Sequence, residues 1–229
     1  MQKNPHYTER VKRLKSRVLG TKAEMDLENA KLLTEGFIES EGQPLALKKA
    51  YAFRKQCREK TVTIWPDELI VGCSGSKMRA GILCADVCWS VLNDELDTIN
   101  TRRYDPFILK DEDRRIFEDV IRPYWKGRSN FEAWQTQIPD EVRALRDTGV
   151  IYINRKAVRG FGETTAGYET VVKEGINGIT ARINKLMGEA DAAQPGGLDK
   201  INYYRALLLA AEGIVALAGR YALEAEKQA

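Results

Sequence analysis

The sequence predicts a mostly α-helical fold with a few short β segments. Two patterns predict it: apolar residues recur at helical spacing through most of the chain, and only three short stretches are rich in β-branched residues. Of the 229 residues, 43% are hydrophobic and 30% are charged, which is typical of a soluble globular protein. The net charge of +3 is too small to favour nucleic acid or an anionic membrane as a partner.

Residues 1–60 are expected to form a three-helix segment. Helices are expected at about 8–18, 23–39 and 44–60. In the first, Val11, Leu14 and Val18 form one apolar stripe, and the basic side chains around it are typical of a solvated surface. Gly42 ends the second helix and Pro44 opens the third, because proline fits the first turn of a helix.

Residues 61–167 are expected to mix helices, irregular structure and short strands. Strands are expected at 61–65, 69–71 and 150–153, where β-branched residues cluster. Helices are expected at about 86–92, 111–121, 131–137 and 140–146. Pro123 is expected to end or kink the chain after the second of these helices, because proline cannot donate a backbone hydrogen bond.

Residues 168–229 are expected to form two long helices, at about 168–187 and 199–226, separated by a turn at 194–197. The last helix is apolar around nearly its whole circumference, so it is expected to pack against further protein, either a second copy or more chain. Its longest apolar run, residues 207–219, contains Glu212 and is shorter than the ~20 residues that cross a bilayer, so no membrane span is expected.

Few residues in the chain are suited to common catalytic chemistry. The single histidine, His6, excludes Ser-His-Asp catalysis and multi-histidine metal sites. The thiols of Cys57, Cys73, Cys84 and Cys88 lack further zinc ligands nearby, and we expect them to be reduced and buried. The chain opens without an apolar signal segment, which favours a cytoplasmic location.

Six strings occur in a defined order along the chain. They are Glu-Asn-Ala-Lys at 28–31, Ala-Tyr-Ala at 50–52, Ile-Trp-Pro-Asp-Glu-Leu-Ile-Val-Gly at 64–72, Asn-Asp-Glu-Leu-Asp-Thr at 93–98, Pro-Tyr-Trp-Lys-Gly at 123–127, and the stretch from Gly162 through Tyr168-Glu169 to Gly175. Together they resemble the N-terminal region of the glycyl radical enzymes. The most similar branch is the pyruvate formate-lyase-like group, which contains choline trimethylamine-lyase, glycerol and hydroxyproline dehydratases, isethionate sulfite-lyase and arylacetate decarboxylases.

The resemblance implies a fold and a mechanism. The chain would be the helical N-terminal layer around a ten-stranded α/β barrel, with the barrel itself incomplete. In this family an activating enzyme, which uses an iron–sulfur cluster and S-adenosylmethionine, makes a radical on a glycine near the C-terminus. The radical passes to a cysteine, whose thiyl form abstracts hydrogen from the substrate. These enzymes belong to anaerobic metabolism, and the chain itself is expected to bind no cofactor and no metal.

The chain departs from the family pattern, because neither the thiyl cysteine loop nor the radical glycine string can be found in it. It is therefore expected to contain no catalytic residue and to be inactive alone. One hypothesis makes it the N-terminal part of a glycyl radical lyase or dehydratase, all of it one truncated domain. The other makes it a stand-alone helical interaction module. The expected partners are the C-terminal remainder or a homo-oligomer copy, together with the activating enzyme.

Glu163, Phe161 and Gly162 are the predicted substrate-binding residues of the complete enzyme. In the family's Gly-His-x-x-x-x-Tyr-Glu string, the residue after the glycine faces the substrate, and here that residue is Glu163. A carboxylate there could accept a proton or hold a cation, while Gly162 permits a tight backbone. Arg159 could line the entrance of the same substrate-binding site. The alternatives are that Glu163 is a solvated loop residue or an acid at a helix N-terminus, that Phe161 is a core aromatic residue, and that Arg159 is a surface cation.

Other polar and aromatic residues favour structural roles. Asp67 and Glu68 are adjacent, so in an extended segment they point to opposite faces, and they are expected to be turn and hydrogen-bonding residues. Arg102 and Arg103 follow acidic residues and are expected to form ion pairs. The tryptophans Trp89, Trp125 and Trp134 are expected to be core or interface anchors.

Overall fold

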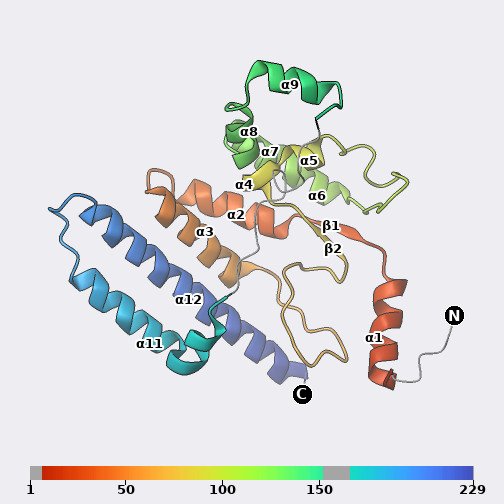
Figure 1. Ribbon diagram of the computed structural model, residues 1–229. Helices are drawn as coiled ribbons and strands as arrows, with labels where there is room; N and C mark the ends of the chain where they lie inside the picture. The colour runs from red at the N-terminus through yellow and green to blue at the C-terminus, as the bar shows by residue number, and fades with distance from the viewer. Residues whose placement is uncertain (1–6, 152–165, 229) are drawn as a thin grey trace.

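A computed structural model of the chain describes residues 7–151 and 166–228 (Figure 1). The first part contains α1 (Glu9–Gly20), β1 (Glu24–Asp26), α2 (Glu28–Glu39), α3 (Leu45–Glu59), β2 (Ala80–Ile82), α4 (Ala85–Cys88) and α5 (Ser90–Asn93). It continues with α6 (Asp111–Ile116), the π-helix η1 (Phe117–Ile121), α7 (Arg122–Trp125), α8 (Asn130–Gln135) and α9 (Asp140–Asp147). The second part contains α11 (Tyr168–Gly188) and α12 (Gly197–Gln228). The expectation of a mostly helical fold is confirmed.

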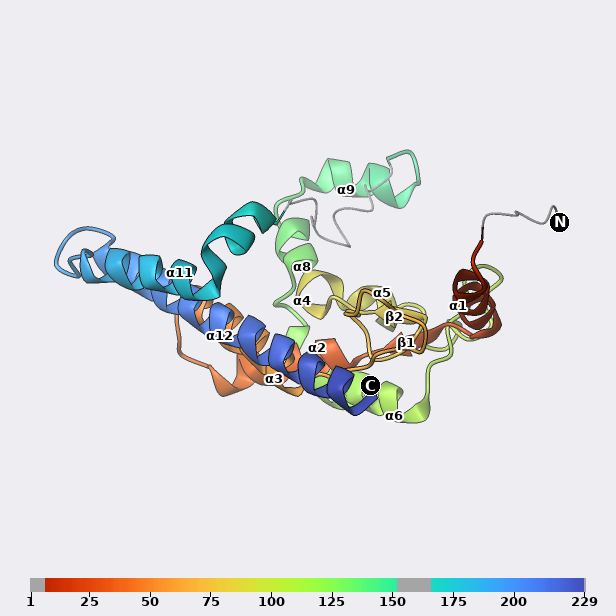
Figure 2. The same cartoon turned by 90° about the horizontal axis from the view of Figure 1, so that it is seen from below.

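Four helices, α2, α3, α12 and α11, lie side by side as a layer (Figures 1 and 2). Helices α2 and α3 approach closely because Gly36 faces Ala52: a Cβ at Gly36 would lie 2.5 Å from the Ala52 Cα. Between α3 and α12, Leu47 and Ala50 pack with Ala206 in a small separate core. Residues far apart in the sequence thus pack together, and the C-terminal helix becomes part of the N-terminal layer.

The main hydrophobic core lies on the other side of α2. It joins β1 and α2 to the segment from 83 to 125, which lies beside α2 in Figure 1. Leu27, Phe117 and Ile121 are fully buried in it, and Trp125 packs edge-on against Phe37 with ring centroids 5.2 Å apart. Aromatic edge-to-face pairs of this kind stabilise a core beyond the area that they bury.

The strands differ from the prediction. Strand β1, expected as the start of a helix, pairs in parallel with β2, with Met25 opposite Gly81. Its backbone is held by distant segments: the Met25 N–H donates to the Ile108 carbonyl at 2.8 Å. Strands expected at 61–65 and 69–71 are absent from the described residues, as is strand structure at 150 and 151. Residue Ile70 is 94% exposed with no strand beside it, and an alternating segment forms a strand only where a partner supplies hydrogen bonds.

Two predicted helices are interrupted. The helix expected at 86–92 is divided into α4 and α5, with Trp89 between them. The helix expected at 111–121 widens into η1, and the chain continues as α7 through Pro123 instead of ending there. In η1 the Arg122 N–H donates to the Phe117 carbonyl, five residues back. A π-helical turn of this type accommodates a proline that cannot donate its own hydrogen bond.

The two long helices near the C-terminus were predicted at nearly the observed positions. Helix α11 is kinked at Gly175, which has φ 65° and ψ 173°, a conformation that suits glycine. Helix α12 has 32 residues, and it is long and apolar enough to cross a membrane by length and composition alone, a test that the core helix of a soluble protein also passes. Its polar residues nevertheless bind α3: Glu212 pairs with Arg54 at 2.9 Å, and Arg220 donates to the Cys57 carbonyl at 3.0 Å.

Helix α12 is only partly covered by the rest of the molecule. Just 17% of its most apolar 18-residue window is buried. One face packs on α3 and, toward its N-terminal half, on α11. Tyr203, Ile214, Val215 and Leu223 are each 45% exposed or more. The described part of the chain therefore leaves this apolar helix facing solvent along one side.

Candidate functional site

The predicted substrate-binding residues Phe161, Gly162 and Glu163 lie outside the described residues, as does Arg159. Their roles stay predictions. The described chain gives the two flanks of this segment, which are Val150 and Ile151 after α9, and Tyr168 at the start of α11.

Both flanks present apolar side chains to solvent. No residue of α9 is buried, and Val150 is exposed. In the first turns of α11, Tyr168 and Val172 are exposed, and Glu169 forms an ion pair with Lys173 on the same helix at 2.5 Å. An ion pair between exposed side chains is weak, and this pair does not shield the apolar side chains of α11 from solvent. The described flanks therefore leave apolar side chains exposed on both sides of the predicted site segment.

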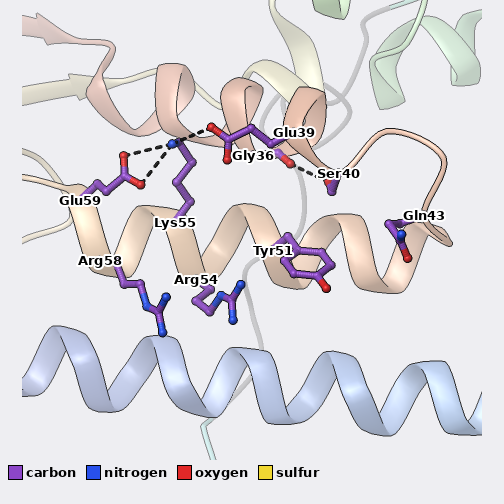
Figure 3. Close-up of a pocket in the computed structure, with 9 residues that line it drawn as sticks. All are labelled: Gly36, Glu39, Ser40, Gln43, Tyr51, Arg54, Lys55, Arg58 and Glu59. Carbon is purple, nitrogen blue, oxygen red and sulfur yellow. Dashed lines mark hydrogen bonds and ion pairs between the residues drawn. The ribbon is translucent and has the colours of Figure 1, made fainter.

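A hollow of about 410 Å³ lies on the helical layer (Figure 3). It is lined by Gly36, Glu39, Ser40, Gln43, Tyr51, Arg54, Lys55, Arg58 and Glu59. Its charges are paired with each other or with α12: Lys55 lies 2.9 Å from Glu39 and 3.1 Å from Glu59, and Arg54 lies 2.9 Å from Glu212. The hydrogen bond to Glu39 raises the pKa of Lys55, so this amine stays protonated and is unsuited to act as a base. The hollow is therefore a polar surface whose charged side chains are paired with one another or with α12.

The turn at Pro66 and Asp67 collects hydrogen bonds, as predicted. The Asp67 carboxylate accepts from Arg13 Nε at 3.0 and 3.1 Å, and Glu68 accepts from the Trp65 N–H at 3.0 Å. The Arg13 guanidinium holds the pKa of Asp67 below its ordinary value. Three basic side chains of α1 thus bind this turn, whereas Lys12 and Lys15 are exposed as expected. The spacing of Arg10, Arg13 and Arg17 was the sequence signal for this shared face.

The other candidates have mixed outcomes. Arg102 forms an ion pair with Glu95, which confirms that expectation, but Arg103 lies over the Tyr104 ring at 5.2 Å. Trp89 and Trp125 are buried core anchors as expected, whereas Trp134 is 39% exposed.

Sequence reasoning missed the role of Glu132. Its carboxylate accepts hydrogen bonds from Trp89 Nε1 at 3.0 Å, from the Gly127 N–H at 3.0 Å, and from the Ser129 hydroxyl at 2.6 Å. Burial acts to raise the pKa of Glu132, but these hydrogen bonds together lower it. The only detectable signal was Ser129-x-x-Glu132, a capping box.

The thiols do not form a site. Cys57 and Cys88 are buried as expected, Cys73 is half-buried, and Cys84 is exposed, contrary to the prediction. Cys84 is the N-cap of α4, so it precedes the helix that contains Cys88. Burial raises the pKa of Cys57. The described residues contain no group of three His, Cys, Asp or Glu side chains placed to hold a metal ion.

Comparison with known proteins identifies the family of the chain. Residues 5–229 match the family described as pyruvate formate lyase-like. The chain belongs to this family. An isethionate sulfite-lyase from Bilophila wadsworthia is 32% identical over 96% of the chain, and a trans-4-hydroxy-L-proline dehydratase from Clostridioides difficile is 26% identical over 96%.

Solved structures of family members share the fold. The glycerol-bound B12-independent glycerol dehydratase from Clostridium butyricum superposes with a TM-score of 0.88 over 96% of the chain, at 28% identity. A structure concerned with 1,2-propanediol dehydration in Roseburia inulinivorans gives 0.88 over 97%, at 27% identity. These relatives are glycyl radical enzymes, and the helical layer of this chain is part of their barrel fold.

The match covers only a part of each relative. The chain spans 28% of the length of the isethionate sulfite-lyase and of the glycerol dehydratase, and 26% of the Roseburia protein. The family is therefore established for the chain, while the activity of a complete enzyme is a matter for proposal.

Proposed function

We propose that the chain is the N-terminal part of a glycyl radical lyase or dehydratase, which cleaves a C–C, C–N, C–O or C–S bond of a small metabolite. The observation that supports this most directly is the family match over residues 5–229, together with the superposition on the glycerol dehydratase over nearly the whole chain. The match at 28% of the relatives' length supports a role as one part of a larger catalyst.

The reacting groups are proposed to lie in protein beyond this region. The thiyl cysteine and the radical glycine belong to that remainder, and none of Cys57, Cys73, Cys84 and Cys88 is proposed to replace the thiyl cysteine. The radical is installed by a separate S-adenosylmethionine and iron–sulfur activating enzyme, which is a proposed partner. The chain alone is proposed to bind no cofactor and no metal and to have no turnover.

Glu163, Phe161 and Gly162 are the proposed contribution of this chain to substrate binding. A carboxylate at Glu163 would accept a hydrogen bond from a substrate hydroxyl, or hold a cationic group, beside the Phe161 ring. The exposed apolar flanks at Val150 and Tyr168 support this proposal, because they leave an edge that further protein would have to close. We propose a cytoplasmic enzyme of anaerobic metabolism that binds neither nucleic acid nor a membrane.

The test uses the complete enzyme that contains this chain, produced without oxygen together with its activating enzyme. Electron paramagnetic resonance should detect a glycyl radical in the complete enzyme and none in the 229-residue chain alone. The variant Glu163→Gln should lower kcat/KM for the cleaved metabolite by at least about tenfold, since it replaces a charged hydrogen-bond acceptor.

Glu141→Gln is the matched control, because Glu141 lies exposed on α9. It should leave kcat/KM unchanged. A glycyl radical that forms in the short chain would contradict the proposal that the radical carriers lie elsewhere. Equal kcat/KM values for the Glu163 and Glu141 variants would contradict the substrate role of Glu163.

A second candidate function is a stand-alone helical module that binds a partner or itself through α12. The exposed side chains of Tyr203, Ile214, Val215 and Leu223 favour it. Size-exclusion chromatography with light scattering on the 229-residue chain separates the two functions: a stable, discrete dimer without dye-accessible apolar surface supports the module. An aggregating or dye-binding chain supports the incomplete enzyme.

A further inference from the structure

Helix α1 is attached to the rest of the chain by charge and not by burial. None of its 12 residues is buried. Its side-chain hydrogen bonds with other elements of the described chain come from Arg10, Arg13 and Arg17. Residues at this spacing of three and four lie on one face of a helix, so α1 presents a single row of guanidinium groups.

The three arginines converge on the turn at Pro66 and Asp67. Arg13 Nε lies 3.0 and 3.1 Å from the two carboxylate oxygens of Asp67. Arg10 Nη1 donates to the Asp67 carbonyl at 2.9 Å, and Arg17 donates to the Pro66 carbonyl and lies 3.4 Å from the carboxylate. Asp67 has φ 73°, which non-glycine residues seldom adopt. The arginines thus hold both the side chain and the backbone of this residue.

The segment that carries the turn has little else to hold it. Within the part of the chain that the structure describes, the hydrogen bonds that join residues 62–72 to other elements all come from these arginines. Its ends are fixed, because the Thr61 hydroxyl donates to Glu28 at 2.6 Å and the Cys73 N–H donates to the Tyr221 hydroxyl at 3.1 Å. Between these anchors lies the exposed apolar tip at Ile70. Helix α1 therefore sets the position of the middle of the segment.

We propose that α1 is an electrostatic strap, which holds residues 62–72 in place through Asp67 and opens when this carboxylate is removed or screened. Ion pairs between exposed groups are weak, and salt at about 1 M shortens the screening length to about 3 Å. A helix of this length is marginal in water without tertiary contacts, so α1 unfolds when the strap opens. The pivot is Thr21, whose carbonyl accepts a hydrogen bond from Arg79 at 2.8 Å.

Hydrogen–deuterium exchange, read by mass spectrometry on the whole chain, tests the strap. At low salt, amides of α1 in Asp67→Asn should exchange about tenfold faster than in the unmodified chain, while amides of α2 and α3 stay unchanged. Salt at about 1 M should accelerate α1 exchange in the unmodified chain by a similar factor and have little further effect in the variant.

Two matched controls separate the strap from general charge effects. Asp97→Asn removes a carboxylate that pairs with Arg114 at 2.6 Å, away from α1. Lys15→Gln removes the same charge from α1 as Arg13→Gln does, without touching the turn. The Asp97 and Lys15 variants should keep the slow α1 exchange, and the Arg13 variant should lose it. Equal α1 exchange in Asp67→Asn and the unmodified chain, or α1 exchange that does not respond to salt, would overturn the proposal.

Discussion

Thr34 connects α2 to the main core through one buried hydrogen bond. Its hydroxyl accepts from Trp125 Nε1 at 2.8 Å and donates to the Ala30 carbonyl at 2.6 Å, and the side chain is fully buried. Thr34→Val keeps the shape but leaves the indole N–H without a partner, so it should lower the free energy of unfolding by about 1–3 kcal/mol. Thr34→Ser keeps the hydroxyl and should cost less. Urea denaturation of both variants gives the comparison, and a valine variant that is more stable than the serine variant would contradict this role.

Glu132 should make the stability of the molecule depend on pH. Its pKa is lower in the folded chain than its ordinary value of 4.5, because hydrogen bonds from Ser129, Gly127 and Trp89 outweigh the effect of burial. A group with a lowered folded-state pKa stabilises the fold fully above its unfolded pKa, and this contribution is lost as the pH falls through the folded pKa.

The free energy of unfolding should therefore decrease below about pH 4.5, and Glu132→Gln should remove part of that decrease. Urea denaturation between about pH 3 and pH 7 measures it. Glu118→Gln is the control, because Glu118 only approaches Arg114 at 3.4 Å on the surface. If both variants keep the full pH dependence of the unmodified chain, Glu132 does not carry this linkage.

Close helix packing in the layer depends on individual glycines. A Cβ at Gly36 would lie 2.5 Å from the Cα of Ala52, which is backbone and cannot move aside alone. Gly36→Ala should therefore lower the free energy of unfolding by about 1–3 kcal/mol, although alanine is the better helix former. Gly219→Ala on α12 has nothing within 4 Å and should instead stabilise by up to about 1 kcal/mol. Urea denaturation should give shifts of opposite sign, and a Gly36 variant as stable as the Gly219 variant would refute the close contact.

Elements with a continuous helical period could be predicted from the sequence, and elements held by distant residues could not. The expected bounds of α3 and α12 lie within two residues of those observed, because one helix uses only its own backbone hydrogen bonds. Strand β1 was missed because its partners lie near residues 80 and 108. The strands expected near Ile70 failed for the same reason, since alternation in sequence does not supply a neighbouring strand.

The candidate site shows the same division at the level of side chains. The structural roles of Trp125 and Glu68 followed from residue type and local spacing. The four hydrogen bonds to Glu132 and the convergence of α1 on Asp67 required knowledge of which segments meet in space. The family, by contrast, followed from the order of short strings, which needs no contacts at all.

At the scale of the whole molecule, the layer of α2, α3, α12 and α11 is covered by the main core on one side and exposed to solvent on the other. Helix α2 lies between the main core and most of α3, which reaches that core through Ala52, and α12 covers α3. The outer side of α12 stays apolar and exposed. Relatives with the same layer are more than three times as long, and we propose that further protein packs on this surface.

The open side of α12 should govern how the chain behaves in solution. Val215 and Leu223 are 53% and 59% exposed, so the double variant Val215→Lys, Leu223→Lys should leave the free energy of unfolding within about 0.5 kcal/mol of the unmodified chain. It should also reduce binding of an environment-sensitive apolar dye and shift light scattering toward the monomer, because lysines interrupt the apolar surface. Gln228→Lys adds a charge at the end of the same helix and should change neither readout. If the double variant instead unfolds the chain, α12 is packed on this side, and the surface is not an opening for further protein.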